Sequence, residues 1–179
     1  IGPNGAGKTT LFNCISGLFP ITSGNILFKN EKITNQRQPI IARKGISRTF
    51  QQLRTFRNLS VLDNVLVGAH TQGKAEAIGA LLRTPAVLKE EKALHEKAMG
   101  YLDLLGLADK AHVEVKSLSY GDQRRVEVAR ALASEPNLVL LDEPAAGMNL
   151  KEAQDLTDFI RWIRDELKKT ILLIEHNMR

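Results

Sequence analysis

A run of residues near the start of the sequence has the types and spacing needed to bind phosphate. It follows the pattern G-x-x-x-x-G-K-T from Gly2 to Thr9. Glycine-rich backbone can turn its N–H groups inward around the phosphates of a nucleotide. Lys8 would bring a positive charge to the β and γ phosphates, Thr9 would ligate Mg²⁺, and a helix beginning near Lys8 would add its positive end. The predicted nucleotide-binding residues of this phosphate loop are Gly2, Pro3, Asn4, Gly5, Ala6, Gly7, Lys8, Thr9 and Thr10.

Further polar groups directly follow apolar runs that read as strands, namely Gln51, the Asp142-Glu143 pair and His176. In parallel α/β sheets, ligands gather beyond the carboxyl ends of the strands. We therefore predict Asp142, Gln51 and Thr9 as Mg²⁺ ligands. Glu143 would orient or deprotonate the attacking water, Gln51 would contact Mg²⁺ or that water, and His176 would hydrogen-bond the γ-phosphate.

Each of these groups also has a simpler explanation when it is considered alone. Asp-Glu-Pro is often just a turn, a glutamine at a strand edge is usually solvated, and a histidine after a strand is usually a surface or core residue. Their order and spacing after a complete phosphate loop favour the catalytic interpretation, with Glu143, His176 and Gln51 as the catalytic candidates.

Alternating strand and helix patterns would position these groups. Residues 71–116 form a charged stretch rich in Ala and Leu, predicted to be helical because Leu94, Ala98, Leu102 and Leu105 recur at helical spacing. The alternation predicts an α/β fold with a parallel sheet that is covered on both faces. Helices are expected over residues 8–16, 39–44, 60–69, 119–134 and 152–167, a hairpin over residues 25–33, and strands over residues 46–51, 138–141 and 170–174.

Composition limits the class of protein. The 179 residues, 43% of them hydrophobic and 25% charged, suffice for one sizeable core. The net charge of +5 would suit a nucleic acid, but the basic residues are scattered, so a nucleotide or an acidic protein surface explains it equally well. No nucleic-acid partner is expected. The single cysteine, Cys14, excludes an intramolecular disulfide and a cysteine-based metal site.

The sequence predicts no membrane span, since its longest apolar runs are far below the roughly 18 residues that a spanning helix needs. A phosphate loop normally follows a core strand, yet a single residue, Ile1, precedes it here. We therefore expect the fold to be truncated.

The segment Leu-Ser-Tyr-Gly-Asp-Gln-Arg-Arg at residues 118–125, with the helix expected after it, resembles the signature motif of the ATP-binding cassette (ABC) ATPases. The phosphate loop is similar to the Walker A motif of that family, Gln51 to its Q-loop, residues 138–143 to its Walker B motif, residues 145–149 to its D-loop and His176 to its switch histidine. The resemblance covers the whole chain. It implies a P-loop NTPase ABC cassette truncated at both ends, with a RecA-like parallel-sheet core (residues 1–58 and 135–179) and a helical subdomain (residues 59–134).

In this family, two ATP molecules are held head to tail between the Walker A motif of one subunit and the signature motif of the other. The resemblance thus implies ATP and Mg²⁺ as cofactors and a second ABC ATPase subunit, identical or different, as a partner. Loss of the γ-phosphate would let the subunits separate. The partner's signature motif would contribute nucleotide-binding residues equivalent to Ser119, Tyr120, Gly121, Asp122 and Gln123.

Several segments narrow the resemblance. Four segments together look like the LivG-like group, the ATPase subunits of branched-chain amino acid importers. They are Ser-Arg-Thr-Phe-Gln at residues 47–51, the Tyr-Gly-x-Gln-Arg-Arg form of the signature, Glu-Pro-Ala-Ala-Gly-Met-Asn at residues 143–149 and Leu-Ile-Glu-His-Asn-Met at residues 173–178. In the common pattern of the ABC family, the signature motif has Gly and Gln at the positions of Tyr120 and Asp122. The D-loop of that pattern has Asp at the position of Asn149. Asp122 falls in a first helical turn, where a carboxylate is favourable.

This resemblance implies a peripheral subunit on the cytoplasmic face of the cell membrane. It would bind integral membrane permease subunits through a groove beside the Q-loop and would serve a substrate-binding protein indirectly. The alternatives are an importer for urea or amides, an exporter ATPase such as one for lipopolysaccharide, and a non-transport ABC ATPase acting on DNA or the ribosome.

Overall fold

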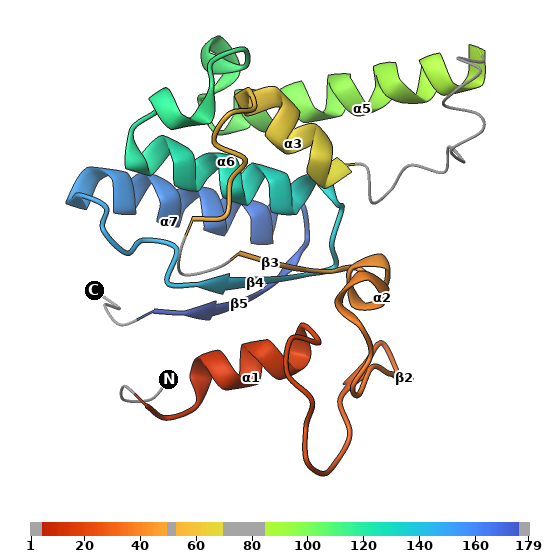
Figure 1. Ribbon diagram of the computed structural model, residues 1–179. Helices are drawn as coiled ribbons and strands as arrows, with labels where there is room; N and C mark the ends of the chain where they lie inside the picture. Colours follow the sequence, from red (N-terminus) through yellow and green to blue (C-terminus); the bar gives the residue numbers. More distant parts are fainter. Residues whose placement is uncertain (1–4, 50–52, 70–84, 176–179) are drawn as a thin grey trace.

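The computed structural model describes residues 5–49, 53–69 and 85–175, and these residues form layers around a parallel sheet (Figure 1). The sheet has the order β3-β4-β5, with β3 at Ile46–Arg48, β4 at Leu138–Asp142 and β5 at Thr170–Ile174. Both strand pairs are parallel, and Asp142 at the end of β4 lies in register with Ile174. The carboxyl ends of the strands therefore meet at one edge, as the sequence predicted.

The central strand β4 sends alternate side chains into two different hydrophobic clusters, as the period of an extended strand requires. Leu140 packs on one face with Phe12 and Ile174, whereas Val139 and Leu141 join the cluster on the other face. All three β4 side chains have no solvent exposure. Helix α1 (Lys8–Ile15) lies on the first face, and α6 (Tyr120–Ala133) and α7 (Leu150–Asp165) lie on the second (Figure 1).

The chain between the phosphate loop and the first sheet strand forms small elements near the α1 face. Strands β1 (Leu27–Phe28) and β2 (Glu31–Lys32) pair antiparallel, which confirms the predicted hairpin. Its two-residue turn is made by Lys29 and Asn30, both with positive φ, the backbone that such tight hairpins require. Helix α2 (Gln38–Arg43) then leads into β3.

Helices α3 (Val61–Ala69) and α5 (Pro85–Leu104) pack above α6, and the hydrophobic cluster on this side of the sheet is continuous from α3 to α7. The prediction of helix up to residue 116 was wrong beyond Leu104. Gly106 has a φ of 65°, and the N–H of Leu107 donates to the carbonyl of Leu102 at 2.8 Å, a bond typical of a glycine helix terminus. Two short 3₁₀ helices follow, Ala108–Lys110 and Val115–Ser117.

Side-chain caps fix the beginnings of α6 and α7. The Ser119 hydroxyl accepts a hydrogen bond from the N–H of Asp122 at 3.2 Å, so α6 begins where the sequence predicted. Helix α7 begins at Leu150, two residues before the predicted start. Asn149 and Glu152 form a reciprocal capping box there, with bonds of 2.9 and 3.0 Å. The asparagine in place of the usual aspartate therefore has a structural role as a helix cap.

Candidate active site

The described part of the phosphate loop leads directly into α1. Gly5 and Gly7 both have a φ of 81°, a conformation that favours glycine, and Gly7 is the N-cap of α1. Lys8 and Thr9 therefore stand in the first turn, where unpaired backbone N–H groups and the helix dipole attract an anion. Thr9 and Thr10 are exposed. Gly2, Pro3 and Asn4 lie outside the described residues.

Helix α1 begins on the side of the molecule where β4 and β5 end (Figure 1). Phe12 anchors the helix under the sheet by packing in one buried cluster with Leu140 and Ile174. The start of the phosphate-loop helix therefore lies on the same side of the molecule as the carboxyl end of β4, of which Asp142 is the last residue.

Asp142 is the last residue of β4, and its side chain is buried, with 2% exposure. Its Oδ2 accepts a hydrogen bond from Nη2 of Arg48 at 3.1 Å. Its Oδ1 is also buried but has no hydrogen-bond partner among the described residues. A buried carboxylate oxygen without a partner is costly, so this atom fits a ligand of a cation such as Mg²⁺.

Arg48 was not assigned a role from the sequence, although it is central to this edge of the sheet. Its Nη1 donates to Oδ1 of Asn13 at 2.6 Å and to Oγ of Ser16 at 3.0 Å. Burial lowers the pKa of its guanidinium, while the hydrogen bond to Asp142 and the charge of Asp142 act in the opposite direction. Because the ordinary pKa of arginine is far above neutrality, the group stays charged.

Glu143 follows Asp142 and has an unusual backbone. Its φ is 49°, in the left-handed region that costs a residue other than glycine about 1–2 kcal/mol. Its N–H donates to the carbonyl of Ile174 at 2.9 Å, and its own carbonyl accepts from the N–H of Ala146 at 3.1 Å. Such strain in a turn at the ligand-binding edge of a sheet is a feature of functional sites.

Glu175 is a second residue that the sequence did not single out. Its Oε1 accepts a hydrogen bond from the N–H of Ala145 at 3.1 Å, so it ties the end of β5 to the turn that follows Glu143. Gln51 and His176 lie outside the described residues. Thr49, the last described residue before Gln51, continues the pairing of β3 with β4, since its N–H donates to the carbonyl of Leu140 at 2.9 Å.

The signature segment (residues 118–125) forms the start of α6. Tyr120 is 43% exposed and packs on Gly147, where an added Cβ would lie 3.2 Å from its ring. Gly121 is buried against Glu152, and an added Cβ there would meet the carboxylate at 2.8 Å. The Asp122 carboxylate, expected to be favourable in the first turn, pairs with Lys110 at 2.8 Å.

The described part of the phosphate loop, residues 5–9, and the signature segment lead into helices on different faces of the sheet. The beginning of α1 lies on one face of the sheet and α6 lies on the opposite face, so the sheet separates them (Figure 1).

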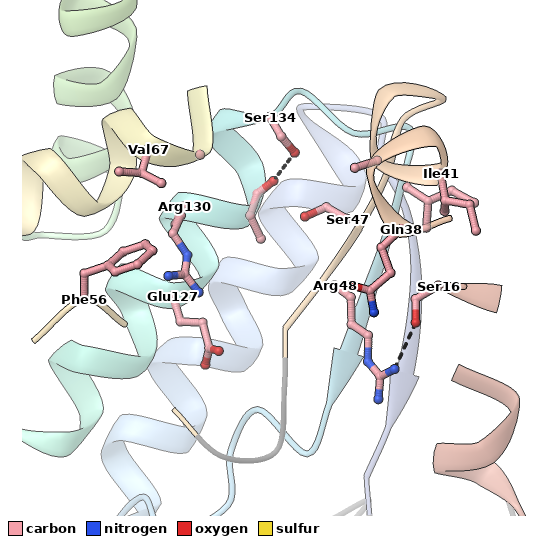
Figure 2. A pocket seen from close by; sticks show the side chains of 14 residues that line it. Ser16, Gln38, Ile41, Ser47, Arg48, Phe56, Val67, Glu127, Arg130 and Ser134 are labelled. Carbon is pink, nitrogen blue, oxygen red and sulfur yellow. Dashed lines mark hydrogen bonds between the residues drawn. The ribbon is translucent and has the colours of Figure 1, made fainter. Parts of the chain in front are cut away.

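A groove lies between the α2–β3 region and helices α3 and α6, with a volume of about 340 Å³. Figure 2 shows apolar and charged side chains from both sides of it. The side chains of Arg130 and Phe56 both line the groove, and the Arg130 guanidinium lies 5.5 Å from the ring centre of Phe56. The side chains that line this groove include Gln38, Ile41, Ala42, Ile46, Arg48, Phe56, Val67, Glu127, Arg130 and Ala131.

Among the described residues, no helix is long and apolar enough to cross a membrane. Residues 1–146 match the family model described as ABC transporter. The chain is 43% identical over 179 residues to LivG of Escherichia coli K12, a high-affinity branched-chain amino acid transport ATP-binding protein, covering 100% of this chain and 70% of LivG.

Solved structures agree with this match. The ADP conformation of MJ1267, an ATP-binding cassette of an ABC transporter, superposes with a TM-score of 0.82 at 34% identity, over 100% of this chain and 69% of that one. A dimeric, post-hydrolysis state of the cassette MJ0796, bound to ADP and Pi, gives 0.79 at 28% identity, over 99% and 73%.

Proposed function

The chain belongs to the ABC transporter family of ATP-binding cassettes, and we propose that it is the ATP-hydrolysing subunit that energises an importer of branched-chain amino acids. The observation that carries the ATPase part is the half-satisfied, buried carboxylate of Asp142 at the carboxyl end of β4, on the side of the molecule where the phosphate-loop helix begins. The substrate class rests on the identity with LivG, which extends over the whole chain. The proposed organisation is a sheet core of residues 1–58 and 135–179 with a helical subdomain of residues 59–134.

Two subunits would complete each ATP site. The phosphate loop of one subunit would hold the β and γ phosphates, and residues 119–123 of the other would cover the γ-phosphate with the N-terminus of α6. The opposite placement of these segments in one chain and the dimeric state of MJ0796 both support this arrangement. The second subunit is an identical or related cassette.

Thr9, Gln51 and Asp142 would hold Mg²⁺, which neutralises phosphate charge when it is bound. A metal that binds through one carboxylate plus substrate phosphates suits the unpaired Oδ1 of Asp142. Glu143, held by the strained turn after β4, would accept the proton of the attacking water. His176 would bind the γ-phosphate, and Gln51 would help to orient the water.

The groove between the α2–β3 region and helices α3 and α6 would receive a short helix from an integral membrane permease subunit. A substrate-binding protein would deliver the amino acid to that permease. The groove suits such a partner because it presents the apolar side chains of Ile41, Phe56 and Val67 next to buried charge. Phe56 is 48% exposed and Val67 is 40% exposed, so both have apolar surface left to cover.

We expect the subunit to co-purify with the permease subunits in detergent. The substitution Val67→Arg should weaken this association roughly tenfold or more. The larger side chain would fill the groove and carry a charge that docking must desolvate. Val113→Arg is the matched control, because Val113 is 37% exposed and lies outside the groove.

Both variants should bind ATP like the parent protein, which separates docking from nucleotide binding. Equal permease association of Val67→Arg and Val113→Arg would contradict the assigned groove. Persistent association of the parent with DNA or ribosomes in place of a permease would contradict the transport function.

A further inference from the structure

Arg48 connects three elements of the site through one side chain. It is the last residue of β3, and its guanidinium reaches Asp142 on β4 as well as Asn13 and Ser16 at the end of the α1 helix. The guanidinium also lies 5.7 Å from the ring centre of Phe12 on α1. Figure 2 shows the side chain pointing from β3 toward Ser16.

The pair of Arg48 and Asp142 is buried on both sides, with side-chain exposures of 7% and 2%. A buried ion pair is stabilising when its remaining polar atoms are also satisfied. Here Arg48 binds Oδ2, and Oδ1 is left without a hydrogen bond among the described residues. A purely structural pair would leave that oxygen as an uncompensated cost, whereas a site that receives a cation needs it.

We propose that Arg48 is a positioning residue that binds Oδ2 of Asp142 and thereby reserves Oδ1 for the divalent cation that accompanies the nucleotide. This proposal rests on the proposed role of Asp142 as a metal ligand. Hydrogen bonds that orient a ligating carboxylate from behind are a general feature of metal sites, and their loss weakens metal binding about 10- to 100-fold.

The contacts of Arg48 to α1 give the carboxylate a fixed place relative to the phosphate loop. Asn13 and Ser16 belong to the end of the same short helix that begins at Lys8 and Thr9. Because one planar guanidinium binds both that helix and Asp142, a shift of the helix is transmitted to the carboxylate. A lysine at position 48 would keep the positive charge. Its single ammonium could not reproduce the planar set of hydrogen bonds that the Arg48 guanidinium makes to Asp142, Asn13 and Ser16.

The test is Mn²⁺ binding, measured by electron paramagnetic resonance of the purified protein loaded with the non-hydrolysable analogue AMP-PNP. Arg48→Met should weaken Mn²⁺ binding about 10- to 100-fold, while the affinity for AMP-PNP in EDTA stays within about twofold of the parent. Arg43→Met is the control, because Arg43 is an exposed residue of α2 and its replacement removes the same charge.

Arg48→Lys should recover part of the lost Mn²⁺ affinity. Complete recovery by lysine would overturn the positioning role, because charge alone would then suffice. Unchanged Mn²⁺ binding in Arg48→Met, or an equal loss of AMP-PNP affinity in EDTA, would also overturn it. If Arg48→Met does not fold, Asn13→Ala decides the question, since it removes an anchor of Arg48 and keeps the ion pair. We expect several-fold weaker Mn²⁺ binding from Asn13→Ala, and parental binding would refute the proposal.

Asp142→Ala separates failure of this inference from failure of the proposed function. If Asp142→Ala weakens Mn²⁺ binding and Arg48→Met does not, Asp142 keeps its role and the role of Arg48 is refuted. If Asp142→Ala binds Mn²⁺ like the parent, the metal-ligand role itself is wrong, and the role of Arg48 is refuted with it.

Discussion

Glu143→Gln should lower the rate of ATP hydrolysis by at least about 100-fold while ATP still binds. Glutamine keeps the size and hydrogen-bonding ability of the side chain but cannot take a proton from water. Since the strained φ of 49° is equally accessible to glutamine, the turn after β4 should be preserved. With the γ-phosphate retained, the subunits should stay together as a closed dimer.

Phosphate release measures the loss of turnover, and size-exclusion chromatography with light scattering in the presence of ATP measures the dimer. Glu91→Gln is a suitable control, because Glu91 is an exposed residue of α5 and its replacement makes the same chemical change. Turnover by Glu143→Gln equal to that of the parent would show that Glu143 is not the catalytic base.

Lys8→Ala should weaken ATP binding roughly 10- to 100-fold, which corresponds to the loss of a charge-assisted hydrogen bond of about 1.5–3 kcal/mol. Lys8 is the first residue of α1, directly after the left-handed Gly7, and the proposed role of its ammonium is to bind the β and γ phosphates. Alanine is the best helix former, so α1 should not lose stability.

Isothermal calorimetry with ATP measures this loss. Lys89→Ala serves as the control, because Lys89 is exposed on α5. An affinity for ATP that is the same in Lys8→Ala and Lys89→Ala would rule out the phosphate-loop interpretation.

The parts of the fold that depend on local pattern could be predicted from the sequence. Four apolar residues followed by Asp142 predicted a strand with a carboxylate at its end, and the structure confirms the strand, which runs from Leu138 to Asp142. The start of α6 at the Ser119 cap was also correct. The start of α7 was predicted two residues late, although Asn149 followed by Glu152 is a capping-box pattern that could have revealed it.

Long-range partnerships could not be predicted. Arg48 and Asp142 are 94 positions apart, and their pairing depends on β3 lying beside β4 in the sheet. Asn13 in α1 gives no local signal that it will anchor an arginine from another strand. The contact between Glu175 and the N–H of Ala145 likewise depends on two chain segments meeting at the sheet edge. Gln51 and His176 keep the roles proposed from the motifs.

The central claim is that this chain supplies the ATP-driven step of branched-chain amino acid import. The most direct measurement is uptake of radiolabelled leucine, isoleucine, valine and urea in cells that lack the gene, compared with cells that carry the parent gene or Glu143→Gln. We predict that uptake of the three amino acids requires the parent gene and is not restored by Glu143→Gln, while urea uptake is the same in all strains. Amino acid uptake that is independent of the gene, or a loss confined to urea, would contradict the account.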